Sequence, residues 1–331
     1  MTTMPSADVI RPDGQTLLAF AGVVLFGGIN AIAVKASVAE LSPLWSAGLR
    51  FAAAGLLLMV IVATTRRPLP RGRSLTGALL YGVLAFAASY ALIYPALRDV
   101  PAGTAMVLIS LVPLVTFGLA IAHGQERFHV QGLLGALIAL GGVFVIVADQ
   151  LSAAVPLASL LLIVAGVVFI AESGVILKWI PRSDPFATNA VAMLAGASIL
   201  LVVSLVGGET WRIPAEPATW LSVAYLVVFG SIALFGLYVF ALRRWTASAV
   251  SYVTLLMPLV TVPLAAALLA EQVTLSFVIG GVIALVGVYV GAFRRVRPRR
   301  ASTTGLPECL PIDACAEPAP AAGVPVTRTA S

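Results

Sequence analysis

Charged residues are scarce in this sequence of 331 residues. Asp, Glu, Lys and Arg together make up 10% of the chain, whereas hydrophobic residues make up 60% and the mean hydropathy is +1.05. A folded water-soluble chain of this composition could not cover its surface with polar groups, so a soluble globular protein is excluded. The composition instead predicts an all-α integral membrane protein, because an α-helix satisfies its own backbone polar groups in hydrocarbon.

Histidine is almost absent, with only His123 and His129, both in one polar joint. The zinc-protease pattern His-Glu-x-x-His, the serine-hydrolase pattern Gly-x-Ser-Gly and the phosphate-binding P-loop do not occur. The sequence therefore predicts no enzyme activity, no bound metal, no cofactor and no direct use of ATP. A selectivity loop or a ring of charge, as expected of an ion channel, is not evident either.

Cysteine is equally rare, and both copies, Cys309 and Cys315, lie in the Pro- and Ala-rich segment 294–331. After its first basic residues this segment has no apolar run of membrane-spanning length, so it is predicted to be a disordered cytosolic tail. A disulfide or a metal site would need an oxidising compartment or further ligands. Two reduced thiols are therefore the simpler interpretation.

Long hydrophobic stretches dominate the rest of the chain. Each is about 20 residues long, the length that crosses roughly 30 Å of hydrocarbon as a helix, and short polar joints separate them. The first stretch is interpreted as a retained helix and not as a signal peptide, because its apolar core is too long and nine similar stretches follow. The ten predicted transmembrane helices are residues 16–35, 43–64, 75–97, 103–122, 129–148, 156–178, 186–206, 219–242, 248–270 and 274–293.

Basic residues predict the orientation, since loops rich in Lys and Arg tend to stay in the cytoplasm. The joints after the second, fourth, sixth and eighth spans and the end of the tenth are basic, whereas the opposite side carries Lys35, Arg98 and Arg212. A multi-pass protein of the cell membrane with a cytosolic segment 1–15 and both termini in the cytoplasm is expected. Loops that face anionic lipid also explain the net charge of +6 without nucleic acid.

The tetrapeptide Pro-Leu-Val-Thr occurs twice, beginning at Pro113 and at Pro258. A shift of 145 residues that superposes the two copies also superposes Glu126 on Glu271. The sequence therefore predicts two related units of five helices, and an odd number of crossings inverts the second unit in the membrane. Inverted repeats are typical of carriers that alternate between inward-open and outward-open states. The two predicted units are residues 16–148 and 156–293.

Three stretches resemble a known family. "GGINAIAVKASVAELSPLWSAGLRF", which begins at Gly27, resembles the opening motif of EamA-type proteins of the drug/metabolite transporter (DMT) superfamily, although the usual Trp before it is Phe26 here. "LVPLVTFGLAIAHGQE" and "LMPLVTVPLAAALLAEQ" resemble the Pro-centred helix of that family. The resemblance implies a ten-helix secondary transporter that exports a small organic metabolite, either an amino acid-like compound or a drug. A flippase for lipid-linked sugars or other amphiphiles, which shares this architecture, is the alternative.

Two charged residues are predicted to lie inside spans, where each costs about 2.5 to 3.5 kcal/mol on insertion scales. Arg50 lies about 10 Å below the outer end of the second helix by helical rise. It is expected either to reach the interface and pair with Glu40 or backbone carbonyls, or to attract anions in an outer vestibule. Glu172 lies near 9 Å inside the sixth helix and cannot reach water as Arg does. It is a candidate proton carrier, with a bond to Ser173 or Asn189 as the alternative.

Uncharged residues supply the other candidates for a substrate site, which needs an apolar wall beside a few polar groups. Tyr94 and Tyr252 are predicted to form the wall. The polar candidates are Asn30, Thr116 and Thr261, although hydrogen bonds between helices explain such residues as often. The predicted partners are a small-molecule substrate, membrane lipid and protons as a candidate coupling ion. Both a monomer and a homodimer remain open.

The paired prolines are predicted to be hinges. Pro113 and Pro258 each remove a backbone hydrogen bond and free a carbonyl one turn earlier, near Ile109 and Thr254. Prolines that merely kink a helix are common in membranes, so a simple kink is the alternative. Their equivalent positions in the two units favour a role in the moving parts or in the site.

Overall fold

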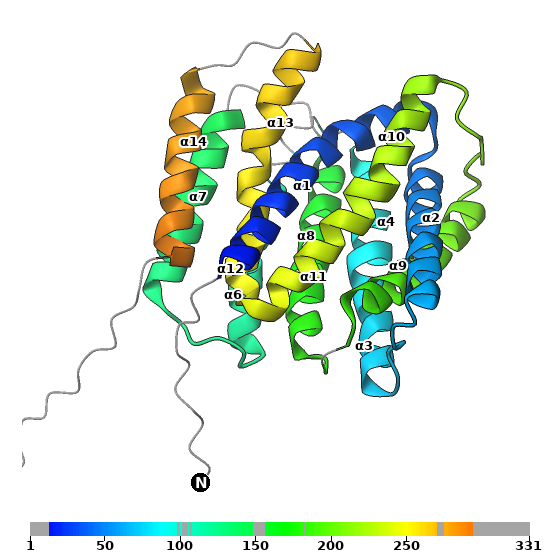
Figure 1. The fold of residues 1–331 in the computed structure, drawn as a ribbon. Coiled ribbons are helices and arrows are strands. Elements are labelled where there is room, and N and C mark those ends of the chain that lie inside the picture. The colour runs from blue at the N-terminus through cyan, green and yellow to red at the C-terminus, as the bar shows by residue number, and fades with distance from the viewer. Residues whose placement is uncertain are drawn as a thin grey trace, which may run out of the picture. The chain divides into compact units, whose positions relative to one another are not determined.

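The computed structural model describes residues 13–97, 100, 105, 108–147, 156–181, 183–269 and 275–293 (Figure 1). Within these ranges the chain forms helices and no β-strand, as the composition predicted. Glu271, the two cysteines and the predicted tail lie outside the described residues, as does the basic residue Arg182.

Among the described residues, six helices are long and apolar enough to cross a membrane. They confirm the predicted spans that begin at residues 16, 43, 75, 156, 186 and 219. Proline in the first turn, where no amide hydrogen is needed, starts three of them, and Asp184 caps one by accepting from Phe186 N at 2.9 Å. These six are α1 (Gly14–Glu40), α2 (Pro43–Thr64), α3–η1–α4 (Arg73–Ala96), α8 (Leu157–Trp179), α9 (Pro185–Val206) and α10–η3–α11 (Pro217–Arg244).

Shorter apolar helices occupy the remaining predicted spans. Two of these predicted spans, 103–122 and 248–270, contain a turn in the part that the structure describes. A tight turn from Leu111 N to Leu108 O at 3.0 Å lies within the fourth span, and one from Leu255 N to Tyr252 O at 3.1 Å interrupts the ninth. The shorter helices are α6 (Val112–Ala122), α7 (Val130–Val147), α12 (Ala247–Ser251), α13 (Val253–Leu269), α14 (Leu275–Val288) and η4 (Tyr289–Phe293).

Two pairs of helices pack along each other in antiparallel directions, α2 with α9 and α7 with α14. In Figure 1, α7 and α14 lie side by side. Their contact is close because glycine faces the partner: a Cβ on Gly142 would lie 2.4 Å from Ala284 N, and one on Gly287 would lie 2.3 Å from Ala139 N. Small residues allow such approach between membrane helices, where dispersion contacts replace the hydrophobic effect.

Two helices are widened in the middle by a π-helical segment, η1 (Val83–Ala88) and η3 (Val228–Ala233). The two segments are separated by 145 residues, the same shift that superposes the two Pro-Leu-Val-Thr copies. The helices around them pack in a matching way: α1 lies against α10, α11 and α13, and α8 lies against α3, α4 and α6. Figure 1 shows α1 between α13 and the α10–α11 helix.

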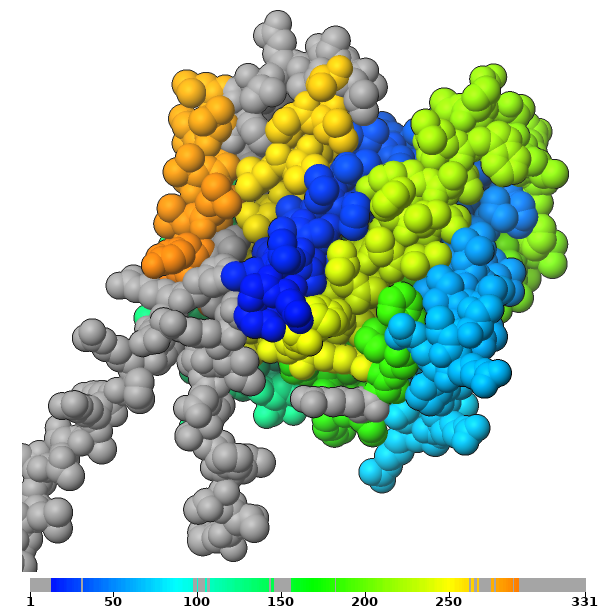
Figure 2. Space-filling view, viewed as in Figure 1, coloured from blue at the N-terminus to red at the C-terminus, as the bar shows by residue number. Residues whose placement is uncertain are grey.

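Large apolar side chains point outward from this arrangement. Figure 2 shows a face that α1, α10, α11 and α13 largely cover. Leu18 of α1 is 75% exposed, and Leu221 of α10 is 73% exposed. On other helices Phe144 and Val202 are also exposed. Apolar surface on this scale is unfavourable in water and favourable against lipid chains.

Candidate functional site

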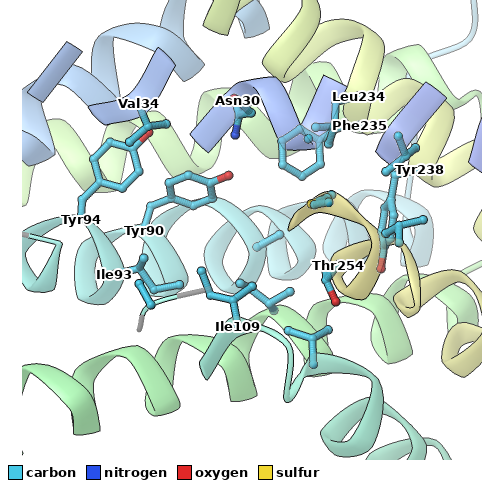
Figure 3. A pocket seen from close by; sticks show the side chains of 18 of the residues that line it. Asn30, Val34, Tyr90, Ile93, Tyr94, Ile109, Leu234, Phe235, Tyr238 and Thr254 are labelled. Atoms are coloured by element: carbon cyan, nitrogen blue, oxygen red, sulfur yellow. The ribbon is translucent and has the colours of Figure 1, made fainter. Parts of the chain in front are cut away.

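A cavity of about 240 Å³ lies among α1, α4, α6, α8, α11 and α13. Figure 3 shows side chains from several of these helices that point into the same space. Most of the wall is aliphatic or aromatic, as is typical of sites for small molecules. The helix breaks before α6 and at Tyr252 lie beside the cavity, because Ile109 and Thr254 line it.

Residues on facing walls of the cavity are related by the 145-residue shift. Several wall positions in α4 and near the start of α6 have a counterpart in α11 or α13 that also lines the cavity. Part of the cavity wall is therefore built from positions that the shift superposes. The related pairs are Tyr90 with Phe235, Ile93 with Tyr238, Ile109 with Thr254, and Val112 with Met257.

The polar groups of the cavity come mainly from α1 and the tyrosines. Asn30 lines the cavity, and its Oδ1 is buried with no hydrogen-bond partner among the described residues. Lys35 is the one charged residue among the described residues of the wall, and no carboxylate accompanies it there. Ser173 and Ser251 also line the cavity but donate to backbone carbonyls of their own helices. The site is therefore apolar with a local excess of positive charge.

Arg50 is buried behind this wall, with 1% of its surface exposed. Its Nε donates to Ser231 Oγ at 2.8 Å, and its Nη2 donates to the Gly230 carbonyl at 2.7 Å, inside η3. The predicted pairing with Glu40 at the interface is wrong, since Glu40 accepts from the amides of Ala215 and Glu216. Arg50 does donate to a backbone carbonyl, as the alternative expected, but this carbonyl belongs to Gly230 of η3. The widened turn of η3 exposes the carbonyl that the guanidinium reaches.

Arg50 also organises the aromatic wall. Its Nη1 donates to Tyr94 Oη at 3.1 Å, and its guanidinium carbon lies 4.7 Å from the ring centroid of Phe51 and 5.6 Å from that of Tyr90. The predicted wall residue Tyr94 does line the cavity. Because its oxygen accepts from Arg50, its hydroxyl hydrogen is free to donate elsewhere.

Three other predicted site residues are not brought to the cavity wall. Thr116 is buried with its hydroxyl oxygen unpartnered among the described residues. Tyr252 is buried and donates to the Gly132 carbonyl at 3.1 Å, which joins the break in the ninth span to α7. Thr261 donates to the Gly28 carbonyl at 2.8 Å and so joins α13 to α1. For the last two, the alternative of a hydrogen bond between helices describes the geometry.

Glu172 has a partner that the sequence analysis did not propose. Its Oε1 lies 3.2 Å from His123 Nε2, at the end of α6, whereas Ser173 donates to Ile170 O and Asn189 to Phe235 O. The other carboxylate oxygen, Oε2, is buried without a partner among the described residues. Glu172 does not line the cavity, although its neighbour Ser173 does.

The two predicted hinge prolines have different local settings. Pro113 stands in the first turn of α6, directly after the turn at residues 110–111, so it begins a helix. Pro258 lies inside α13, as does Pro263. Both paired prolines are close in sequence to wall residues of the cavity, Val112 in one case and Met257 in the other.

Several wall residues were missed because no local pattern marks them. Tyr81, whose hydroxyl is buried and unpartnered among the described residues, and Phe235 are unremarkable in a sequence rich in apolar residues. The 145-residue shift could have found Phe235, since it superposes on Tyr90. No sequence signal pointed to His123 as the partner of Glu172.

A family model agrees with this architecture: the EamA-like transporter family matches residues 15–148 and again residues 157–292. The chain belongs to the EamA-like transporter family. The predicted resemblance is confirmed, and the family indicates a transporter and not an enzyme. Together with the apolar helices, it makes the chain a multi-pass membrane protein of the DMT superfamily.

Curated relatives cover most of the chain. It is 29% identical over 306 residues to a protein of Escherichia coli K12 named "Probable amino-acid metabolite efflux pump", covering 89% of this chain and 99% of that one. It is 27% identical over 256 residues to the "Uncharacterized inner membrane transporter YedA" of the same strain, covering 77% and 83%. A solved crystal structure is similar with a TM-score of 0.73 at 17% identity, over 86% of this chain and 99% of that one, which supports the fold.

Proposed function

We propose that this member of the EamA-like family is a secondary transporter that moves a small organic metabolite through the central cavity by alternating access. The observation that carries the proposal is the composition of the wall. Tyr90 and Ile93 face a space that their 145-residue counterparts, Phe235 and Tyr238, also line. Substrate sites of transporters with inverted repeats lie at such an interface between equivalent halves.

The architecture that we propose is ten membrane crossings in two inverted units of five helices, with both termini in the cytoplasm. The antiparallel pairs α2 with α9 and α7 with α14 support it, because inversion makes equivalent helices run in opposite directions. The equivalent π-helical segments η1 and η3 support it as well. The six long helices would supply six crossings and the shorter apolar helices the remainder.

In this orientation one end of the cavity wall faces the outside. Lys35, Val38 and Leu97, near the ends of α1 and α4, line its outer part. The cytoplasmic end is closed by side chains that follow α6. Gln125 Nε2 donates to the Val175 carbonyl at 2.8 Å, and Glu126 accepts from Ser248 Oγ at 2.8 Å.

The chemistry of the wall favours a substrate with an apolar or aromatic body and a carboxylate. Lys35 and the Tyr94 hydroxyl can donate hydrogen bonds, and buried Arg50 adds positive charge behind them. Asn30 adds an amide that can pair with either a donor or an acceptor. Amino acid-like compounds fit this description, and the name of the efflux-pump relative supports export as the direction.

A flippase for lipid-linked sugars is the second candidate. It would need a basic residue that is free to hold a phosphate inside the membrane, and Arg50 lies buried within α2. Arg50 instead holds Tyr94, Ser231 and the Gly230 carbonyl. This arrangement favours the carrier over the flippase.

The test is transport by the full chain in proteoliposomes. The panel consists of labelled aromatic and aliphatic amino acids, with an amide and an amine of the same shape that lack the carboxylate. We expect exchange of at least one carboxylate-bearing compound, with or without a pH gradient. Ile109→Trp should block exchange by filling the cavity, whereas Leu134→Trp, on a side chain that is 48% exposed, should not.

Absence of exchange for every compound, in a protein that is folded and inserted, would contradict the proposed transport activity for this substrate class. Equal exchange in both Trp variants would contradict the cavity as the path.

A further inference from the structure

His123 and Glu172 meet where the end of α6 lies against α8. His123 Nε2 and Glu172 Oε1 are 3.2 Å apart, and the exposed fractions of the two side chains are 33% and 22%. The residues come from the first and second parts of the chain, 49 positions apart (172 − 123). Their contact is therefore one of those that hold the two parts together at this end.

The hydrogen bonds of His123 fix how many protons this contact holds. His123 Nδ1 lies 2.9 Å from the Leu119 carbonyl, which can only accept, so Nδ1 carries a hydrogen. A hydrogen bond between Nε2 and Glu172 Oε1 then needs one more proton. That proton is on the imidazole, as in an ion pair, or on the carboxyl group. Without it, the lone pair of Nε2 would face a carboxylate.

The surroundings of the second carboxylate oxygen of Glu172 support a proton shared between Glu172 and His123. Oε2 is buried without a hydrogen-bond partner among the described residues. An unpartnered oxygen costs less free energy in a neutral acid, or beside an imidazolium, than in an isolated carboxylate.

We infer that His123 and Glu172 form a proton-binding site that holds the cytoplasmic end of the transporter closed while the site is occupied. The inference rests on the proposed alternating access and names its coupling ion. The site binds one proton between His123 Nε2 and Glu172 Oε1. Loss of that proton to the cytoplasm separates α6 from α8.

Two neighbouring contacts tie the same end of α6 but do not need a proton in this way. Gln125 Nε2 donates to the Val175 carbonyl at 2.8 Å, and Glu126 accepts from Ser248 N and Oγ at 3.2 and 2.8 Å. Glu126 accepts from two donors of Ser248, and a carboxylate can make both of these hydrogen bonds without a proton of its own. The His123–Glu172 contact is therefore the one of these three that high pH would open.

Several other ionisable groups on the elements around α8 have partners of their own, and none of the groups named here forms an ion pair with His123 or Glu172 in the described residues. Lys178 of α8 donates to the Leu242 and Trp245 carbonyls, Arg243 donates to the Ser183 carbonyl, and Arg244 pairs with Asp13. Phenols ordinarily ionise only near pH 10. The remaining ionisable groups of these elements and of the joint after α6 are Arg73, Tyr81, Tyr90, Tyr94, Tyr238, Arg127 and His129.

The sign of the pH effect follows from proton counting. The closed state holds one proton in the pair. Opening separates His123 Nε2 from the carboxylate with which it shares the proton, so the open state binds that proton less tightly than the closed state. Raising the pH therefore favours opening, and the opening equilibrium changes by at most about tenfold per pH unit for one proton.

The test measures opening by thiol labelling, without a known substrate. Cys309 and Cys315 are replaced by Ser, and Ser251→Cys places one thiol on the cavity wall in α12. Inside-out vesicles expose only the cytoplasmic face to a membrane-impermeant maleimide between pH 6 and 9. The labelling rate is divided by that of the denatured protein at the same pH, which removes the intrinsic pH dependence of the thiol. We expect the normalised rate to rise several-fold above pH 7.

Two variants should abolish the pH dependence in opposite ways. Glu172→Gln can donate its amide hydrogen to Nε2 without titrating, so labelling should stay slow at every pH. His123→Ala removes the contact, so labelling should be fast at every pH. Gln125→Ala is the matched control: it removes a neighbouring bond that carries no titrating proton, so it should raise the rate while leaving the pH dependence.

A rate that does not change with pH in the parent would overturn the proton site, as would an unchanged pH dependence in Glu172→Gln. Substrate exchange by the same preparation separates this failure from failure of the proposed function. If substrate exchange persists while labelling does not depend on pH, the proposed transport activity is supported and the proton site is contradicted. Absence of exchange removes the transport proposal whatever the labelling shows.

Discussion

Arg50 illustrates how one buried charge is held within this membrane protein. Its guanidinium makes three hydrogen bonds, to Ser231, Tyr94 and the Gly230 carbonyl, and lies against the rings of Phe51 and Tyr90. The planar, forked geometry of Arg suits three separate acceptors, whereas the single ammonium of Lys does not. The described residues place no carboxylate within salt-bridge distance of it.

Replacement of this residue should therefore destabilise the fold even when the charge is kept. In Arg50→Lys we expect the loss of at least one charge-assisted hydrogen bond, which costs about 1.5 to 3 kcal/mol. The measurement is the apparent Tm of the purified protein in detergent, with the exposed residue Arg71→Lys as control. Equal Tm values for both variants would contradict the structural role of Arg50.

The hydroxyl of Tyr94 should matter for the substrate. Tyr94→Phe keeps the ring but removes both the acceptor for Arg50 and the donor to the cavity. One lost hydrogen bond of about 1.4 kcal/mol raises KM about tenfold. KM is measured with whichever carboxylate-bearing compound exchanges. Tyr289→Phe, on an exposed side chain outside the cavity wall, is the control and should leave KM unchanged.

Glycine decides how closely two helices approach, and this is the clearest feature at the scale of an element. On α7, Gly142 faces α14 so closely that a Cβ would lie 2.4 Å from Ala284 N. Its neighbour Gly141 has no atom within 4 Å of the same position. Adjacent glycines on one helix therefore have different roles, one in packing and one at an open position.

Substitution of each glycine separates these roles. Gly142→Ala should force α7 and α14 apart and lower the free energy of unfolding by about 1 to 3 kcal/mol, the usual cost of overpacking. Gly141→Ala should be neutral or slightly stabilising, because Ala favours the helix over Gly by roughly 0.5 to 1 kcal/mol. Apparent Tm values in detergent give the comparison. A lower Tm for Gly141→Ala than for Gly142→Ala would contradict the close packing.

The paired prolines, Pro113 and Pro258, affect the shape of single helices. If they shape moving helices, Pro113→Ala and Pro258→Ala should each lower the transport rate while insertion and abundance stay nearly normal. At Pro258, inside α13, a restored backbone hydrogen bond would stiffen the segment beside the cavity. Pro113 stands in the first turn of α6, so Pro113→Ala would act by releasing the fixed φ angle where that helix begins. Pro217→Ala, in the first turn of α10, is a control with no hydrogen bond to restore. Full activity of the double variant would leave both prolines as simple kinks.

The orientation of the whole molecule is a separate prediction. Because basic residues follow the second, fourth, sixth and eighth spans, single cysteines near Arg71 and Arg182 should resist membrane-impermeant thiol reagents in intact cells. A cysteine near Glu209 should react. Labelling of the Arg71 position from outside would overturn both the orientation and the inverted arrangement of the two units.

Much of the molecule was predictable from the sequence because hydrophobicity is a local property. The six long helices lie within a few residues of their predicted spans, and proline and capping residues begin several of them. The helix breaks beside the cavity were only partly predicted. Proline marked the right region, but whether the helix bends or restarts depends on the turns that neighbouring helices permit.

Side-chain partners were decided only by the tertiary structure. Arg50 binds residues that are 180 and 181 positions away, inside a π-helical turn that no composition rule locates. His123 and Glu172 meet because α6 and α8 pack together at one end. In an apolar chain, lipid-facing and buried positions look alike, so periodicity does not identify the faces that meet. The sequence by itself determined an all-helical membrane protein with related parts, whereas packing determined which of its few polar groups share a site.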